Sequence, residues 1–362
     1  MEINAKYPDK TYLYSIGTTK ENRAILVLAI SLIKPSRLEF QKYKNVKLIG
    51  NIHGDEAVGR ELLLHFIEYI LTPSNEDGYK ILNSFMKETI IHILPSLNPD
   101  GFEHALQVEN HQWRGNSDPN VDLNRNFPDY FMENDVPREL ETVAVMNWLR
   151  EINFVFSISF HGGALVVSYP YDNKNPISQS NPSNENLSDD DDVFKHLSKS
   201  YVGVLQQDAI IGQCSREEYI EPGITNGAKW YPITGGMQDY NYFNGVFELT
   251  IELSCPKFPE PTALLTYWNS HKDSIIRILD ETRRGIRGRV LTINKLPVPY
   301  AEIYVKNRIH NVFTNNEGYF WRLLLPGSYV IKVNIPNVTT QFFPVQVPLN
   351  TGYVDVELVL NI

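Results

Sequence analysis

The chain of 362 residues has little cysteine and no long apolar run. Its two cysteines, Cys214 and Cys255, permit either one disulfide in an oxidising compartment or two reduced thiols in the cytosol. No stretch approaches the roughly 20 apolar residues that cross a bilayer, so we expect no transmembrane segment in this chain. Residues 1–10 are polar and lack the apolar core of a signal peptide, which leaves either a removed leader or a cytosolic protein.

An excess of basic charge is also missing. The chain carries 33 Lys and Arg against 43 Asp and Glu, a formal net charge of -10, which argues against a protein that binds nucleic-acid phosphates. Hydrophobic residues make up 42% of the chain, enough to bury a large core. Asn186-Leu187-Ser188 and Asn337-Val338-Thr339 match the N-glycosylation triplet, although such triplets are frequent by chance.

The hydrophobic pattern changes at residue 285. Before it, apolar runs alternate with segments of helical spacing, which predicts an α/β sheet with helices on both faces. The expected strands lie at 24–33, 46–52, 89–95, 154–160 and 246–253, and the expected helices at 57–71, 137–151, 193–208 and 261–283. Residues 172–192 read as a surface loop and 212–237 as an irregular glycine-rich stretch. Residues 285–362 show short strand-like runs broken by Pro, Gly and Asn, typical of a small β-sandwich, so we predict domains 1–284 and 285–362.

One set of residues suits a metal ion. His53 and Glu56 are three residues apart at a junction between strand and helix, so both side chains can reach one cation, although such a pair is more often simply hydrogen-bonded. His161 ends another predicted strand, and sites in α/β sheets form where strands end. Three protein ligands would leave zinc an open position for catalysis. We expect the remaining histidines to be structural: His65, His92, His104, His111, His196, His271 and His310.

Other polar residues suit a reacting or binding group. Glu252 ends a strand expected to be buried, where an acidic residue must be paired or functional, but Glu248 lies on the same face and the pattern does not choose between them. Asn124 and Arg125 stand side by side in a turn that suits a grip on a carboxylate. Taken alone, that turn would more simply be a capped turn with a surface arginine.

Six ordered segments together resemble the zinc metallocarboxypeptidase family, and specifically its regulatory branch, which includes carboxypeptidases D, E, M and N. These segments are residues 50–61, 97–102, 122–128, 161–165, 235–242 and 252–259. Residues 319–327 resemble the transthyretin-like domain that marks this branch. The resemblance implies a mixed central sheet flanked by helices, followed by a small all-β sandwich. Lys6-Tyr7-Pro8 resembles the end of the family's first helix, so we expect the chain to begin within or just after that helix.

The resemblance also implies a role for each candidate residue. It assigns one zinc ion to His53, Glu56 and His161, the general base to Glu252, and stabilisation of the oxyanion to Arg114. It assigns the terminal carboxylate of the substrate to Asn124, Arg125 and Tyr231, and the side-chain pocket to Asp172 with Gln238 nearby. It implies a disulfide between Cys214 and Cys255. The segment before Arg114 is shorter than the family pattern, so the aim of this side chain is less fixed than that of the ligands.

These assignments predict an exopeptidase that removes single C-terminal Lys or Arg residues from peptides in the secretory pathway or outside the cell. A buried carboxylate in the pocket favours basic side chains because an apolar one would leave its charge unpaired. We expect a monomer that binds no nucleic acid. Three alternatives stay open: a catalytically silent peptide-binding member of the family, a tubulin-type deglutamylase with a basic pocket, and a β-domain that serves as an interaction scaffold.

Overall fold

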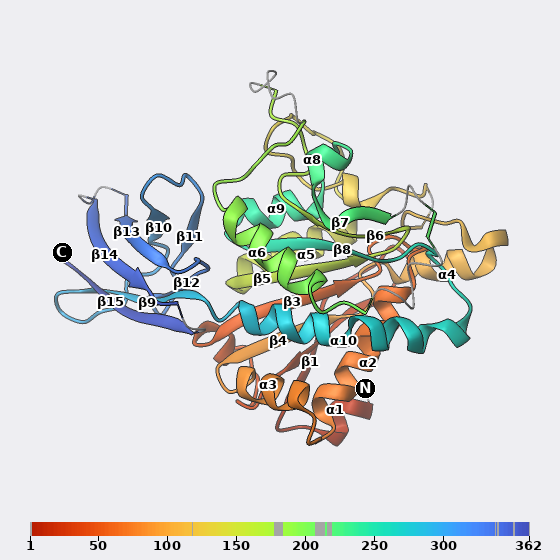
Figure 1. Cartoon of the computed structure of the whole chain (residues 1–362), viewed down its shortest axis with the longest axis horizontal. Helices are drawn as coiled ribbons and strands as arrows, with labels where there is room; N and C mark the ends of the chain where they lie inside the picture. The colour runs from red at the N-terminus through yellow and green to blue at the C-terminus, as the bar shows by residue number, and fades with distance from the viewer. Residues whose placement is uncertain are drawn as a thin grey trace.

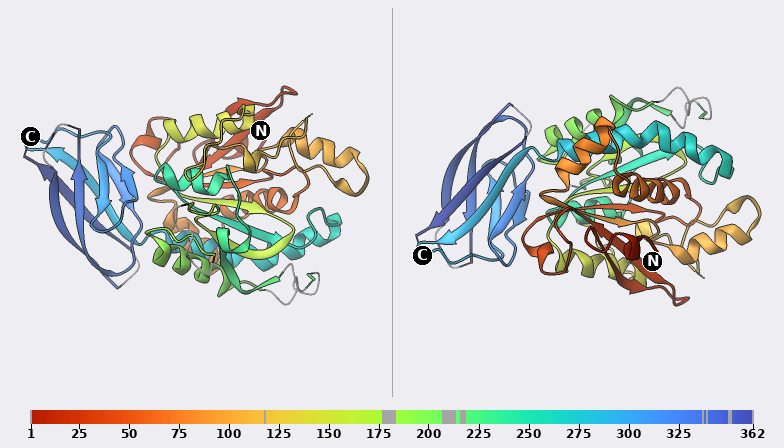
Figure 2. Two further views of the ribbon diagram at one scale, coloured as in Figure 1. Left: turned by 90° about the horizontal axis from the view of Figure 1, so that it is seen from above. Right: turned by 90° about the horizontal axis from the view of Figure 1, so that it is seen from below.

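The chain folds into a larger α/β unit and a smaller all-β unit that lie side by side (Figures 1 and 2). The computed structural model describes residues 2–117, 119–176, 184–206, 214–215, 219–336, 338, 340–349 and 352–361. Among these residues, no helix has both the length and the apolar character needed to cross a bilayer.

The larger unit is built on a mixed sheet in which eight described strands pair in the order β1-β2-β4-β3-β5-β8-β6-β7. Their bounds are β1 Thr11–Thr18, β2 Ala24–Ile30, β3 Lys44–Gly50, β4 Thr89–Leu94, β5 Phe154–His161, β6 Ala164–Tyr169, β7 Tyr219–Asn226 and β8 Phe247–Ser254. The central strands β4, β3, β5 and β8 are parallel to one another. Their carboxyl ends therefore share one edge of the sheet, where a site is expected.

Helices cover both faces of this sheet (Figure 1). They are α1 Glu2–Lys6, α2 Val58–Leu71, α3 Asp77–Phe85, α4 Pro99–Gln107, α5 Leu140–Glu151, α6 Asp191–Val202, α8 Gly227–Trp230, α9 Met237–Phe243 and α10 Leu264–Glu281, with 3-10 turns at Glu39–Gln41, Glu109–His111, Leu123–Arg125 and Pro261–Ala263. Successive side chains of a strand point to opposite faces. Leu48 of β3 accordingly packs in one core with α2 and α10, whereas Ile49 packs in a second core with Trp148 of α5 and Met237 of α9.

The smaller unit consists of two packed sheets. One pairs its strands in the order β11-β10-β13-β14 and the other in the order β12-β9-β15. Their bounds are β9 Gly285–Thr292, β10 Glu302–Val305, β11 Asn311–Phe313, β12 Tyr319–Arg322, β13 Gly327–Asn334, β14 Gln341–Val347 and β15 Tyr353–Leu360. Its own core includes Ile303, Phe320 and Leu358, while Trp321 and Leu323 pack instead in the core of the larger unit. We propose the division into domains 1–284 and 285–362 on this basis.

The predicted fold class is confirmed, with corrections to individual segments. The stretch 212–237, expected to be irregular, contains β7 and α8 among its described residues. The stretch 172–192 is not simply a surface loop, because Asp172 and Asp190 in it are buried. Helix α6 ends at Val202 rather than at residue 208. Strands β1 and β6 were not expected.

Candidate active site

Three candidate ligands meet at the carboxyl ends of β3 and β5. His53 and Glu56 lie between β3 and α2, and His161 is the last residue of β5, which pairs with β3 in parallel. One ligand atom from each of the three residues lies within 4.8 Å of the others, and all three side chains are buried. Within the part of the chain that the structure describes, this is the one such group of His, Cys, Asp or Glu.

The two histidines are held so that the same ring nitrogen faces Glu56. The Nδ1 atoms of His53 and His161 each lie 3.0 Å from a carboxylate oxygen of Glu56. The Nε2 atom of His53 lies 3.1 Å from Asp122 Oδ1, and the Nε2 atom of His161 lies 3.0 Å from Ser159 Oγ. An outer partner on Nε2 fixes the ring and leaves Nδ1 as the metal ligand, which is the usual arrangement around zinc.

The chemistry of this group fits zinc. His53 Nδ1 is buried and forms no hydrogen bond, although Glu56 Oε1 lies 3.0 Å away. Two imidazoles with one carboxylate are donors that zinc accepts. Burial opposes ionisation of Glu56, but His53 and His161 hold its pKa well below the ordinary range, so the carboxylate is charged. The predicted zinc site of His53, Glu56 and His161 is confirmed.

Glu252 lies next to this site because of strand register. In the parallel pair β5 and β8, His161 is the partner of Glu252. The Glu252 side chain is buried, its Oε2 has no hydrogen-bond partner, and burial followed by the charge of Glu56 raises its pKa. Glu248, the alternative on the same strand, accepts a hydrogen bond from Ser157 and lies 3.7 Å from Lys47 Nζ inside the core. The geometry therefore separates two carboxylates that the sequence pattern did not.

Two cations approach the ligand Glu56. Arg114 Nη1 lies 3.0 Å from Glu56 Oε1, and its Nε donates to Asp122 Oδ2 at 2.8 Å. Lys257 Nζ lies 3.2 Å from Glu56 Oε1, and sequence reasoning assigned this residue no role. The only available signal was its place in the segment 252–259. Gly163, at φ +112°, leaves room for this lysine, because a Cβ there would lie 2.8 Å from Lys257 Cε.

A cavity of about 260 Å³ opens beside the ligands. Arg114, Asn124, Tyr231 and Glu252 line it, but Arg125 is not among its lining residues. Asn124 Oδ1 accepts a hydrogen bond from the Met237 backbone at 2.9 Å, which leaves its Nδ2 available as a donor. Arg125 Nη1 is engaged with the Asn124 carbonyl at 2.9 Å, and the side chain is about one-third exposed.

Asp172 also lines this cavity and is buried. Gln238 Nε2 donates to Asp172 Oδ1 at 2.8 Å, and Gln238 Oε1 in turn accepts from the Thr250 backbone N–H at 2.8 Å. Burial, followed by the charge of Asp239, raises the pKa of Asp172 well above its ordinary value. Gly227 is required here, because a Cβ at this position would lie 1.9 Å from Asp172 Oδ1. The structure thus holds a carboxyl group firmly at the cavity wall.

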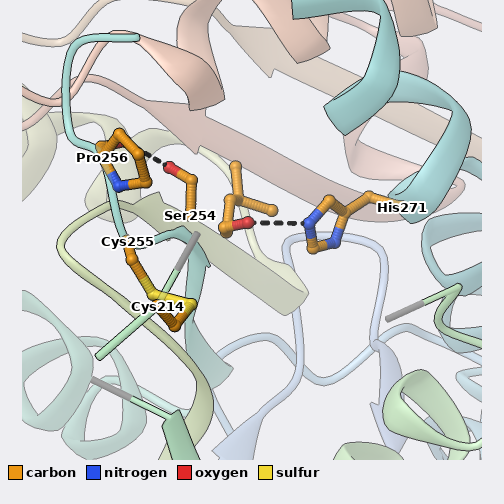
Figure 3. The surroundings of a disulfide bond; sticks show 6 residues. Cys214, Ser254, Cys255, Pro256 and His271 are labelled. Atoms are coloured by element: carbon orange, nitrogen blue, oxygen red, sulfur yellow. Dashed lines mark hydrogen bonds between the residues drawn. A yellow bond between two sulfur atoms is a disulfide. The ribbon is translucent and has the colours of Figure 1, made fainter. Parts of the chain in front are cut away.

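The predicted disulfide is present between Cys214 and Cys255, whose Cα atoms are 5.2 Å apart (Figure 3). Cys255 follows β8 directly, so the bond ties the end of the strand that carries Glu252 to a segment 41 residues earlier. Two residues before Cys255, the Leu253 carbonyl lies 2.9 Å from His271 Nε2. Burial lowers the pKa of His271 to about 4 and that of His92 to about 3, which fits the structural role expected for both.

Of the two asparagines predicted to be glycosylated, the structure describes one. Asn186 is half-buried and its Nδ2 donates to the Asn173 carbonyl at 2.7 Å, a bond that attachment of a glycan would have to open. Asn337 lies outside the described residues. Glycosylation of Asn186 stays a prediction.

Comparison with known proteins agrees with the fold and the metal site. A family model described as zinc carboxypeptidase matches residues 1–274, and the chain belongs to this family. It is a zinc metallocarboxypeptidase, an exopeptidase. A second model, described as carboxypeptidase regulatory-like domain, matches residues 285–361, so the chain falls in the branch that carries this domain.

The chain is similar to named members of that branch. It is 40% identical to carboxypeptidase M of Mus musculus over 351 residues, which is 96% of this chain and 78% of the relative. It is 40% identical to carboxypeptidase D of Homo sapiens over 339 residues, 91% of this chain but only 24% of that longer relative. Among solved structures, thrombin activatable fibrinolysis inhibitor aligns with a TM-score of 0.60 at 20% identity, covering 77% of this chain and 73% of that one, which supports the fold alone.

Proposed function

We propose that this enzyme removes single C-terminal Arg or Lys residues from peptides. The observation that carries the proposal is Asp172, a buried carboxyl group that lines the cavity and forms no salt bridge with any lysine or arginine among the described residues. A buried charge needs a partner, and a guanidinium or ammonium group on the substrate would supply it. Arg-ended peptides can bind through two parallel hydrogen bonds, which Lys cannot reproduce.

The residues around the metal ligands bind the terminal carboxylate of the substrate and stabilise the charge that develops during the reaction. Asn124 and Tyr231 bind the terminal carboxylate from the cavity wall, and Arg125, one residue along from Asn124, binds it once it turns from the Asn124 carbonyl. A bound carboxylate explains why only the last residue is removed. Arg114 supports the negative charge that develops on the scissile carbonyl oxygen, a contribution of about 3 to 4 kcal/mol for one such donor in other hydrolases.

Glu252 is the general base and then the general acid. Its raised pKa suits a group that takes a proton from the attacking water and passes it to the leaving nitrogen. Zinc, when bound by His53, Glu56 and His161, supplies the Lewis acid that activates water and polarises the carbonyl. Every ligand and the base are present, which argues against a catalytically silent peptide-binding protein.

We also propose that the enzyme works in the secretory pathway or outside the cell, as a monomer. The Cys214–Cys255 disulfide supports an oxidising compartment, because such bonds rarely persist in the cytosol. The relatives named carboxypeptidase M and carboxypeptidase N support peptides as the substrates.

The test is hydrolysis of four peptides that differ only in a C-terminal Arg, Lys, Phe or Glu, each with and without a zinc chelator. We expect chelator-sensitive release of Arg and Lys and little release of Phe or Glu. Release of Glu instead would indicate a deglutamylase and refute the role of Asp172. No release by folded, zinc-loaded protein would favour the peptide-binding alternative.

A further inference from the structure

The short helix α9 holds the proposed substrate pocket at its first turn. Its Met237 backbone N–H donates to Asn124 Oδ1 at 2.9 Å, and its Gln238 side chain donates to Asp172 at 2.8 Å. The carboxylate of Asp239, the third residue of α9, accepts the Asp172 backbone N–H at 2.9 Å. The position of Asp172 therefore depends on the position of α9.

The last turn of the same helix is held by the smaller all-β unit, which is called the β-unit below. Tyr242 is fully buried, and its ring stacks on His310 of the β-unit with centroids 3.8 Å apart and planes 14° from parallel. Its hydroxyl donates to Asp190 Oδ2 at 2.8 Å. Since α9 has seven residues and spans about 10 Å, a shift at Tyr242 reaches Gln238 within roughly one turn of helix.

Asp190 is itself fixed by the β-unit. Arg322 Nη2 donates to both carboxylate oxygens of Asp190, at 2.8 and 2.9 Å, and both side chains are completely buried. Arg308 Nη1 adds a third hydrogen bond at 2.6 Å and also pairs with Asp192. Asp189 accepts the backbone N–H groups of Ile309 and His310. Three acidic residues at the end of the expected surface loop, Asp189, Asp190 and Asp192, thus bind the segment around His310.

Aromatic contacts provide a second connection between the last turn of α9 and the pocket. The ring of Tyr171, the residue just before Asp172, packs edge-on against Tyr242 at 5.5 Å and stacks on Phe243 at 5.5 Å. The Tyr171 carbonyl accepts from Ala228, beside the Gly227 that Asp172 covers. The ring of Tyr171, the backbone N–H of Asp172 and the carboxylate of Asp172 therefore all contact residues of α9.

We propose that docking of the β-unit on Tyr242 is a positioning device for the specificity pocket, in which His310 and Asp190 fix α9 and α9 aims Asp172. This proposal rests on the proposed function, since it assigns Asp172 to the basic side chain of the substrate. Tyr242, His310 and Asp190 are positioning residues, and none of them lines the cavity.

The test compares full-length variants by their kinetics on two peptides that differ only in a C-terminal Arg or Phe. Tyr242→Phe removes only the hydroxyl that reaches Asp190, and His310→Ala removes the stacked ring. The matched control is Glu88→Gln, which weakens another contact of the same β-unit, the 3.1 Å pair of Glu88 with Arg287, neither of which contacts a residue of α9 in the described hydrogen bonds and ion pairs. His310→Phe keeps a ring on Tyr242 and serves as the rescue variant.

We expect Tyr242→Phe and His310→Ala to raise KM for the Arg-ended peptide by about threefold to thirtyfold, the range for residues that modulate a site without touching the ligand. We expect kcat to change by less than about twofold, because the reacting groups are untouched. The Arg-to-Phe ratio of kcat/KM should fall in both variants and hold in Glu88→Gln and His310→Phe.

A ratio that holds in all four variants, whatever their melting temperatures, would overturn the positioning role. An equal fall in the ratio for Glu88→Gln would do the same, because it would trace the effect to general loosening. A wild-type chain that does not prefer Arg would refute the proposed function itself before any variant is compared, so the two failures are distinguishable.

Discussion

Asp172 and Asp190 are buried carboxyl groups 18 residues apart, but they differ in their charge partners and in the direction of their pKa shifts. Two arginines of the β-unit hold Asp190 and, although burial opposes this, keep its pKa below the ordinary value. Asp172 receives hydrogen bonds but no salt bridge from the described residues, and burial raises its pKa. The carboxylate of Asp190 has its charge partners within the chain, at the contact between the two units. The carboxyl group of Asp172 has none among the described residues, and we propose that a ligand supplies it.

The difference has opposite consequences for stability. Asp190 has a lowered pKa in the folded state, so it adds stability above the pKa of the unfolded chain, about 3.9, and that stability is lost as pH falls. Asp172 has a raised pKa, so its burial lowers stability as pH rises above the unfolded value. One carboxylate serves folding at neutral pH, and the other opposes it.

The largest effect should come from the second unmatched carboxylate, Glu252. Glu252→Gln should lower kcat by about 10² to 10⁴, the usual contribution of a positioned general base, with no loss of melting temperature. Release of Arg from a peptide and thermal unfolding measure the two quantities. Glu248→Gln is the control on the same strand: it should keep turnover but lose stability, because Lys47 would lose its buried partner. Equal loss of turnover in both would remove the distinction between them.

The next largest effect is expected at Asp190, the carboxylate whose charge partners lie within the chain. Asp190→Asn should lower the free energy of unfolding by about 3 to 5 kcal/mol at neutral pH, because Arg322 stays buried without its charge partner. Urea unfolding measures this. The exposed pair of Arg287 and Asp355 gives the control, since Asp355→Asn should cost only about 0 to 1 kcal/mol. The difference between Asp190→Asn and wild type should shrink below about pH 4, where the unfolded wild-type chain takes up its proton.

A smaller effect should appear in the pH dependence of selectivity. As the pH is lowered, Asp172 should become protonated at a higher pH than an ordinary carboxyl group, so the Arg-to-Phe ratio of kcat/KM should fall. Ionisations that affect both peptides equally cancel in this ratio. The ratio is measured from pH 8 downward. In Asp172→Asn it should not vary with pH. A ratio that stays constant in the wild type would mean that a different group recognises the basic side chain.

The two regions also differ in how far the sequence predicts them. His53 and Glu56 are three residues apart, and His161 and Glu252 end apolar strands, so local pattern and family resemblance together found the site. Asp190 and Arg322 are 132 residues apart, and no spacing rule joins them. Strand β7 was missed because Pro222 and Gly223 interrupt its pattern, although its pairing with β6 overrides that local preference. Lys257 was missed because a lone lysine has no signature without its carboxylate neighbours.

The most direct test of the central claim is Asp172→Asn, measured for melting temperature and for the Arg-to-Phe ratio in the same preparation. If the unmatched charge exists for the substrate, the variant should be more stable by about 0.5 to 2 kcal/mol, as is common when a functional site is relieved. Its preference for Arg should fall by at least about tenfold, as expected when one buried charge partner is removed. A variant that loses stability and keeps its preference would contradict the account, because Asp172 would then be a structural carboxylate like Asp190.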